Sequence, residues 1–153
     1  EADKGTLFLD DIDESNGCLT VVPGSHKGPV LSLFEGERFT GAVAADEEKK
    51  ALAQSLPCLG KAGAVCLMHT RLLHGSAANG ADKSRGLYIC VYTAADAVPI
   101  ARNPMPSLNE GRIVRGKEAR FARLKEGLVE LPKQPRTASF FTVLGQDSKQ
   151  AAE

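Results

Sequence analysis

The sequence predicts an all-β protein, a sandwich or a barrel, and three observations support this class. Short apolar, β-branched runs alternate with turns rich in glycine and proline. Residues 46–56 form the one convincing helical segment, with acids in its first turn, Asp46 as a candidate N-cap and Pro57 beyond its end. The length of 153 residues suits a single domain.

The expected strands follow from these apolar runs. The first ends in two acids and precedes the turn 13–17, whose Asn-Gly pair is typical of a hairpin. The segment 64–69 is almost wholly apolar, which predicts burial on both faces. The richest run in aromatic and β-branched residues is 85–93. In chain order, the expected strands are 5–11, 18–22, 64–69, 71–75, 85–93 and a last apolar segment, 138–144.

The segments that connect the expected strands are rich in proline and glycine, which interrupt strands. Residues 23–29 (PGSHKGP) predict a structured loop at a strand end, because proline cannot donate to a strand ladder. Prolines and glycines between 96 and 115 predict an extended arm, and 117–125 predicts a short basic helix. No internal repeat is found. The helix 46–56 is expected to be an insertion on a sheet and not part of the sheet itself.

Charge and hydropathy exclude several classes of partner. Lysine and arginine total 19, as do aspartate and glutamate, so no net charge favours nucleic acid. No apolar run approaches the roughly 20 residues that cross a bilayer, and no signal peptide is recognised at the start of the sequence. We therefore expect a soluble, cytoplasmic protein that binds neither nucleic acid nor membranes.

The cysteines form no CxxC pair, and three of them lie in apolar, strand-like runs. Free buried thiols are therefore expected in preference to disulfides or a zinc site. The four positions are Cys18, Cys58, Cys66 and Cys90.

The candidate site centres on His74, because imidazole is the commonest ligand of first-row metals and Gly75 beside it allows close approach. Arg85 follows eleven residues later, so on paired antiparallel strands both side chains can face one cavity. A guanidinium inside a barrel needs an anion, and a carboxylate is its natural bidentate partner. Ser76 shares the strand face of His74 and can donate to the same carboxylate.

Two sequence pieces carry a family resemblance: residues 16–28 (NGCLTVVPGSHKG), and His74-Gly75-Ser76 followed by Asn79 and Arg85. In this order and spacing the chain resembles the phytanoyl-CoA dioxygenase (PhyH) family of Fe(II)- and 2-oxoglutarate-dependent oxygenases. The resemblance covers roughly residues 5 to 95. It implies a double-stranded β-helix, a cupin-like jelly roll. We allow for an incomplete jelly roll in this chain. A short helical insertion and an extended C-terminal arm are expected in addition to it.

The resemblance also implies roles. His74 corresponds to the distal iron ligand, Arg85 to the group that binds the far carboxylate of 2-oxoglutarate, and Ser76 to its helper. Thr6 matches a position that lines the co-substrate pocket, although the residue type there varies. The implied reaction couples decarboxylation of 2-oxoglutarate to hydroxylation of an aliphatic carbon of a small molecule. Fe(II) and 2-oxoglutarate are the implied cofactors, and ascorbate is an optional reductant.

The sequence departs from the family at the metal. The family's His-x-Asp pair is expected about a dozen residues before the first strand, and the other histidines, His26 and His69, are not followed by x-Asp or x-Glu. We therefore expect the C-terminal part of one jelly-roll domain in residues 1–145, with a frayed tail at 146–153.

Other polar residues have simpler interpretations. A loop-fixing hydrogen bond is favoured for His26 over a substrate contact, and a structural role for His69. The acids Asp10 and Asp11 are favoured as solvated turn residues over recruited ligands. The basic residues between 112 and 125 are favoured as a solvated face over a rim for an acidic substrate.

Two hypotheses follow. The first is a PhyH-type oxygenase. In that family the aspartate of the His-x-Asp pair also decides between hydroxylation and halogenation. The second is a non-catalytic or truncated jelly-roll binding module that pairs an open sheet edge with another copy of the chain. The substrate is not specified by the sequence.

Overall fold

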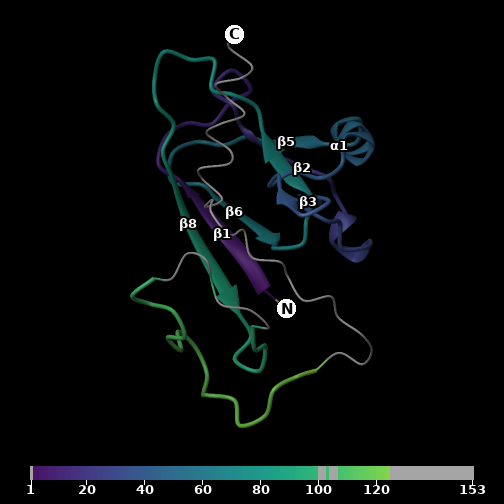
Figure 1. Cartoon of the computed structure of the whole chain (residues 1–153). Helices are drawn as coiled ribbons and strands as arrows, with labels where there is room; N and C mark the ends of the chain where they lie inside the picture. The colour runs from purple at the N-terminus through teal and green to yellow at the C-terminus, as the bar shows by residue number, and fades with distance from the viewer. Residues whose placement is uncertain (1, 100–102, 104–106, 125–153) are drawn as a thin grey trace. The chain divides into compact units, whose positions relative to one another are not determined.

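The computed structural model describes residues 2–99, 103 and 107–124. The chain divides into two compact units: Glu1–Leu31 with Ala44–Thr93, and Ser32–Val43 with Ala94–Glu153. The first unit contains the predicted site and is built from two small antiparallel sheets (Figure 1). Each unit is described by itself.

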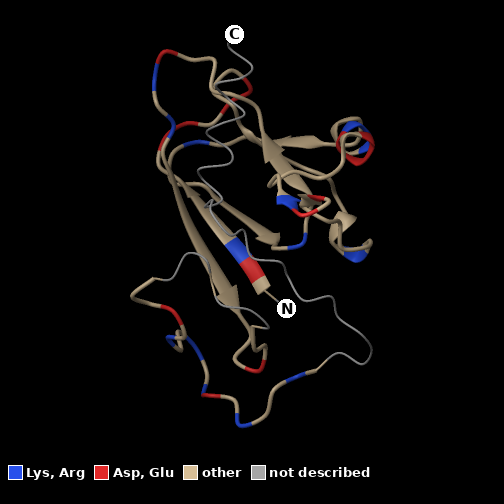
Figure 2. Cartoon of the chain, in the orientation of Figure 1, with Lys and Arg blue, Asp and Glu red and all other residues tan. Residues whose placement is uncertain are grey.

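The first sheet has the order β6-β1-β8, with β1 (Ala2–Phe8) between β6 (Val65–His69) and β8 (Leu87–Thr93). Opposed residues share a face, so the register places Cys66 and Ile89 on either side of Thr6. The three strands are apolar apart from a few residues, and in Figure 2 β1 shows one red and one blue band.

The second sheet has the order β5-β2-β7, formed by Leu56–Cys58, Leu19–Val21 and His74–Ser76. The short helix α1 (Ala45–Leu52) precedes β5, and a 3-10 turn (Ser25–Lys27) lies in the loop after β2. The described part of the first unit is thus mostly strand with one short α-helix, as the sequence predicts.

A small core lies where the chain leaves β1. Phe8, Ile12 and Cys18 form its buried cluster, and Cys66 and Leu87 pack against it. We call the face of the first sheet that carries Thr6, Phe8, Cys66 and Leu87 the inner face. Thr6 is 2% exposed, so this face is covered at the middle of β1, whereas Ile89 opposite it on β8 is 51% exposed.

The opposite face of the first sheet is open. Val65 and Leu67 of β6 are 58% and 77% exposed, and Tyr88 and Tyr92 of β8 also lie in solvent. The prediction that 64–69 is buried on both faces is therefore wrong. An apolar run alone does not distinguish a two-sided strand from one whose second face is uncovered.

The expected hairpin at the Asn-Gly pair is also wrong, because β1 and β2 belong to different sheets. The turn is nonetheless real. Gly17 has a φ of 71°, and a Cβ there would lie 2.6 Å from the carbonyl oxygen of Ala77. The turn carries the chain from one sheet to the other, and Ile12 forms an isolated bridge with Gly60 on the way.

Two helix predictions need correction. Helix α1 begins at Ala45 and ends at Leu52, and Asp46 lies in its first turn instead of capping it, since Ala44 occupies the N-cap without a side-chain bond. Residues 117–124 form no helix. Their basic side chains are exposed, which leaves no apolar face to pack and stabilise a helical turn.

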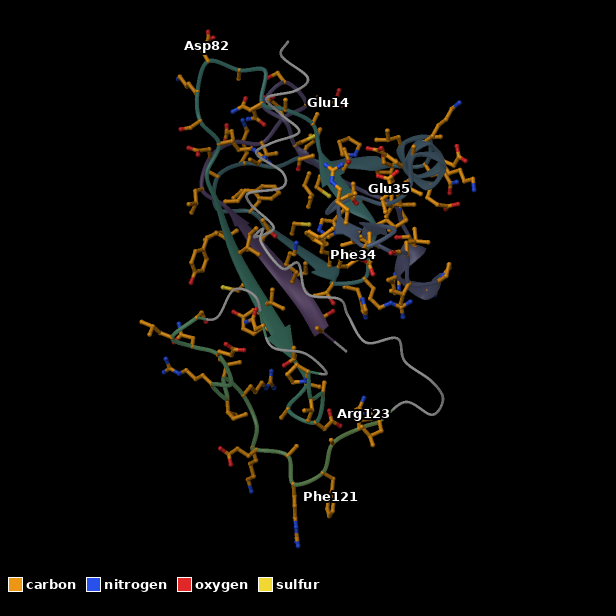
Figure 3. All side chains as sticks on the ribbon, in the orientation of Figure 1. Glu14, Phe34, Glu35, Asp82, Phe121 and Arg123 are labelled. Atoms are coloured by element: carbon orange, nitrogen blue, oxygen red, sulfur yellow. The ribbon has the colours of Figure 1, made fainter. Side chains whose placement is uncertain are left out.

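The second unit has a small hairpin, β3 (Phe34–Glu35) and β4 (Arg38–Phe39). Its two phenylalanine rings meet edge to face at 5.2 Å, and Figure 3 labels Phe34 and Glu35 of β3. In the arm, Arg123 is ion-paired with Asp96 at 2.6 Å. The predicted strand 138–144 and the predicted tail 146–153 lie outside the described residues.

Two compositional predictions can be compared with the structure. All four cysteines are free, as expected, although Cys58, Cys66 and Cys90 are only partly buried. None of the helices in the described ranges has the length and apolar character required to cross a lipid bilayer.

Candidate functional site

His74 begins β7, and its two ring nitrogens have different partners. Nδ1 lies 2.6 Å from the carbonyl oxygen of Leu72, which can only accept, so Nδ1 carries the proton. Nε2 is therefore the nitrogen with a free lone pair. A histidine fixed by a backbone carbonyl in this way is prepared to bind a metal ion through the other nitrogen.

Lys4 of β1 makes the contact at that second nitrogen. Its Nζ lies 3.1 Å from Nε2 of His74, which joins the first sheet to the second. Burial lowers the pKa of Lys4, and the neighbouring Cys66 thiol opposes this effect. The ammonium thus lies where a cation bound by His74 would lie. The sequence interpretation did not single out Lys4, although the two-residue period from Thr6 places it on the same face.

Thr6 lies two residues further along β1 on the inner face and is almost completely buried. Its neighbours across the register are Cys66 and Ile89. Thr6 therefore lies on the same face as Lys4, between the apolar strands β6 and β8.

Arg85 precedes β8 by two residues. The two-residue period places it on the inner face with Leu87, which packs on the core. Its Nε and Nη1 atoms are buried without a hydrogen-bond partner among the described residues. Because a buried guanidinium left unpaired is costly, this arrangement fits a bound carboxylate.

Ser76 ends β7 and shares its face with His74, opposite Leu19. However, the expected pairing of the strands that carry His74 and Arg85 is wrong. Strand β7 pairs with β2, whereas β8 pairs with β1 in the other sheet. The polar linker 77–84 is long enough to cross between sheets, which is why a hairpin is not required. Within the described residues, no hydrogen bond or ion pair joins Arg85 to His74 or Ser76.

No group of three histidine, cysteine or acidic side chains suited to a metal ion occurs within residues 2–99, 103 and 107–124. Among the described residues, His74 is therefore a candidate ligand without two further candidates beside it. Among the cysteines, burial, followed by the neighbouring Cys66 and Cys18, raises the pKa of Cys58 to about 11. A thiol that stays protonated behaves as a small core residue.

The loop after β2 is fixed by residues other than the expected one. Ser25 accepts a hydrogen bond from the Leu73 amide at 2.8 Å, and Arg71 donates to the Gly28 carbonyl at 2.7 Å. His26 instead stacks on His69 at 5.3 Å, and its buried Nδ1 has no partner among the described residues. His69 accepts from the Arg71 amide, which is the structural role expected of it.

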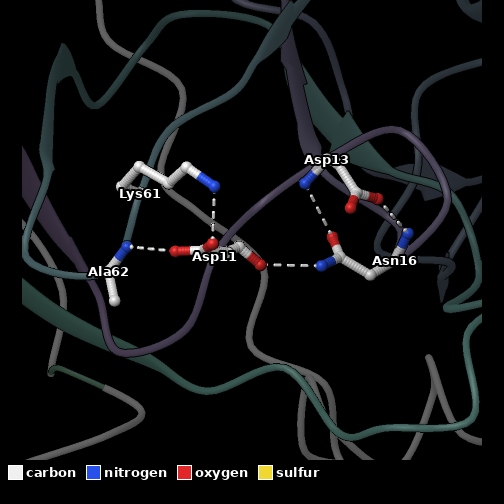
Figure 4. A network of polar contacts seen from close by, with 5 residues as sticks. All are labelled: Asp11, Asp13, Asn16, Lys61 and Ala62. Atoms are coloured by element: carbon white, nitrogen blue, oxygen red, sulfur yellow. Dashed lines mark hydrogen bonds and ion pairs between the residues drawn. The ribbon is translucent and has the colours of Figure 1, made fainter.

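A second polar cluster lies at the other end of β1 (Figure 4). Asp11 accepts from Lys61 Nζ at 2.8 Å and from the Ala62 amide at 2.9 Å, and Asn16 donates to its carbonyl. Asp10 accepts from the Gly86 amide. Both acids are turn residues, as expected. A surface hollow of about 280 Å³ lies here, away from His74, lined by Asp11, Ile12, Asp13, Leu59, Gly60 and Lys61.

Comparison with known families agrees with this geometry. The family model described as phytanoyl-CoA dioxygenase (PhyH) matches residues 4–87, which is more than half of the chain and includes Lys4, Thr6, His74 and Arg85. The chain belongs to the PhyH family. The resemblance seen in the sequence motifs is thereby confirmed.

Two curated relatives illustrate the range of this family. The chain is 35% identical over 130 residues to a probable alpha-ketoglutarate-dependent hypophosphite dioxygenase of Stutzerimonas stutzeri, covering 82% of the chain and 44% of that protein. It is 29% identical over 92 residues to the peroxisomal phytanoyl-CoA dioxygenase of Rattus norvegicus, covering 58% and 27% respectively. The chain thus spans less than half the length of either relative.

Solved structures support the fold. EvdO2 of Micromonospora carbonacea var. aurantiaca, complexed with 2-oxoglutarate, aligns with a TM-score of 0.51 at 28% identity over 67% of the chain and 42% of its own. Apo EctD of S. alaskensis aligns with 0.50 at 26%, over 61% and 32%. The jelly-roll class predicted from the resemblance is confirmed, and the family relationship is to iron- and 2-oxoglutarate-dependent oxygenases.

Proposed function

We propose that the protein is an Fe(II)- and 2-oxoglutarate-dependent oxygenase that hydroxylates a small molecule. The observation that carries the proposal is the buried, unpaired guanidinium of Arg85 on the inner face that also carries Lys4 and Thr6. A dicarboxylate co-substrate supplies the anion that this arrangement lacks. Bound iron would supply oxygen activation.

The chain's own residues have separable tasks in this proposal. His74 offers Nε2 to the metal while its Nδ1–H donates to the Leu72 carbonyl, which fixes the ring. Arg85 orients 2-oxoglutarate by its far carboxylate, with Ser76 as a second donor and Thr6 lining the buried wall. The remaining iron ligands are expected outside the described residues. Residues 1–145 are proposed to form the C-terminal part of a single jelly-roll domain.

The first substrate class is a small organic molecule hydroxylated at an aliphatic carbon. A second class is a small reduced oxyanion. It is favoured by Lys4, a half-buried cation beside the metal ligand, and by the relative named a hypophosphite dioxygenase. In that case hypophosphite, 2-oxoglutarate and O₂ give phosphite, succinate and CO₂: one oxygen atom enters the P–H bond and the other enters succinate.

The test is 2-oxoglutarate-dependent O₂ consumption with succinate detection, using the protein encoded by the complete gene. We expect Arg85→Ala to raise the KM for 2-oxoglutarate by about 100-fold, because a buried charge-assisted contact is worth about 3 kcal/mol. The matched control is Arg112→Ala, an exposed arginine in the arm. Equal KM values in the two variants would reject the assignment of Arg85.

The binding-module hypothesis rests on a different observation. The described residues contain no group of three side chains suited to a metal ion, and the face of the first sheet opposite the inner face is largely apolar and open. Metal analysis and light scattering on the 153-residue chain discriminate between the hypotheses. A stable dimer without iron would favour a module that pairs sheet edges, whereas stoichiometric iron in a monomer would exclude it.

A further inference from the structure

Lys4 is the one Lys or Arg within the three strands of the first sheet (Figure 2). Its acidic neighbour Asp3 points to the opposite face, because successive side chains of a strand alternate. No carboxylate of the described residues is ion-paired with Lys4. A half-buried ammonium in an apolar wall therefore has an imidazole nitrogen as its partner and no anion.

The contact with His74 also fixes where this charge can act. If Nε2 of His74 holds a metal ion, Lys4 cannot remain 3.1 Å from the same nitrogen, because two cations would compete for one lone pair. The flexible four-carbon stem of lysine lets Nζ move aside while the backbone stays in β1. The ammonium then lies within one side-chain pivot of the metal.

An anion between or beside two neighbouring cations reduces their repulsion. The co-substrate's two carboxylates already have partners in the proposed site: the metal for one and Arg85 for the other. The ammonium of Lys4 is therefore left for a third anionic group. Val91 and Ile89, the β8 residues across from Lys4 and Thr6, are aliphatic and cannot bind such a group.

We propose that Lys4 is a specificity-determining residue that binds an anionic oxygen of the substrate beside the iron ligand His74. This inference rests on the proposed oxygenase function and selects substrates that carry a compact oxyanion, such as a phosphorus oxyanion or a carboxylate. Lys4 binds and orients this group and takes no part in proton transfer.

The test uses the protein encoded by the complete gene, loaded anaerobically with Fe(II) and 2-oxoglutarate. Hypophosphite, phosphite and acetate are titrated separately by calorimetry into wild type, Lys4→Met, Lys4→Arg and the exposed control Lys117→Met. We expect at least one oxyanion to bind wild type. Lys4→Met should weaken it about tenfold or more, whereas Lys4→Arg and the control should stay within about threefold.

A separate titration of 2-oxoglutarate keeps the outcomes distinct. Binding of 2-oxoglutarate should be the same in Lys4→Met and wild type within about threefold. If Lys4→Met weakens 2-oxoglutarate and not the oxyanion, Lys4 serves the co-substrate and the inference is wrong. It is also wrong if no oxyanion binds wild type, or if the variant binds as well as wild type. Failure of wild type to bind 2-oxoglutarate would instead reject the proposed function.

Discussion

The two lysine contacts near the ends of β1 differ in one respect that separates structure from function. Lys61 is exposed and paired with Asp11, which also receives the Ala62 amide, so every charge in that cluster has its partner. Lys4 is half-buried and meets only an imidazole, and Arg85 on the same inner face has buried nitrogens without partners. The satisfied cluster holds a turn, whereas the unsatisfied groups are the ones to which the proposed function assigns ligands.

The largest expected effect is at His74, the proposed metal ligand. His74→Ala in the protein encoded by the complete gene should weaken Fe(II) binding by at least about 100-fold, because even residues that only orient a ligand contribute 10- to 100-fold. Anaerobic metal titration with a colorimetric competitor measures this. Unchanged iron affinity in a folded variant, checked by circular dichroism, would show that His74 is not a ligand.

The turn of the satisfied cluster should be the most sensitive structural position. Gly17→Ala should lower the free energy of unfolding by about 2 kcal/mol, because Gly17 has a φ of 71° and the added Cβ meets the Ala77 carbonyl. Urea unfolding measures the loss. The matched control, Gly24→Ala, has a φ of 79° but no atom within 4 Å of the new Cβ, so it should lose less. Equal losses would mean that the contact with Ala77 contributes nothing.

Lys4→Met should not destabilise the protein, in contrast to Gly17→Ala. Removing a half-buried cation that lacks an anion should leave the free energy of unfolding of the metal-free protein unchanged or raise it by up to about 1 kcal/mol. Thermal unfolding beside Lys117→Met tests this. A clear loss of stability in Lys4→Met would mean that the contact with His74 holds the two sheets together.

The smallest effect is expected at the exposed pair. Asp11→Asn should destabilise only slightly, and salt should reduce the difference. The hydrogen bond from Lys61 lowers the pKa of Asp11 from 3.8 and raises that of Lys61 from 10.5. The stabilisation is thus present between these ordinary values. It is lost as pH falls through the folded pKa of Asp11 or rises through that of Lys61. A pH series of unfolding curves that shows no such loss would contradict the pairing.

The sequence predicts most of the strands of the first unit but not which strands pair. Apolar runs at β1, β2, β6 and β8 identify strands because their residue types favour the pleated, half-buried surface. Which strands pair depends on contacts across the whole unit, so the Asn-Gly turn was assigned to a hairpin that does not form. In the same way β7 and β8 were expected to pair, although they lie in different sheets.

The candidate site shows the same limit. His74, Ser76, Arg85 and Thr6 can be named from a motif and a spacing. Lys4 has no motif, because its meaning depends on the contact between β1 of one sheet and β7 of the other. Only the alternation of side chains from Thr6 could have placed Lys4 on the inner face, and alternation does not reveal what lies opposite.

The most direct measurement is the visible absorption of the protein encoded by the complete gene, mixed with Fe(II) and 2-oxoglutarate without oxygen. We predict the charge-transfer band of the chelated co-substrate in wild type and in Arg112→Ala. In Arg85→Ala, the band should need about 100-fold more 2-oxoglutarate. Absence of the band in wild type, or an unchanged titration in Arg85→Ala, would contradict the account.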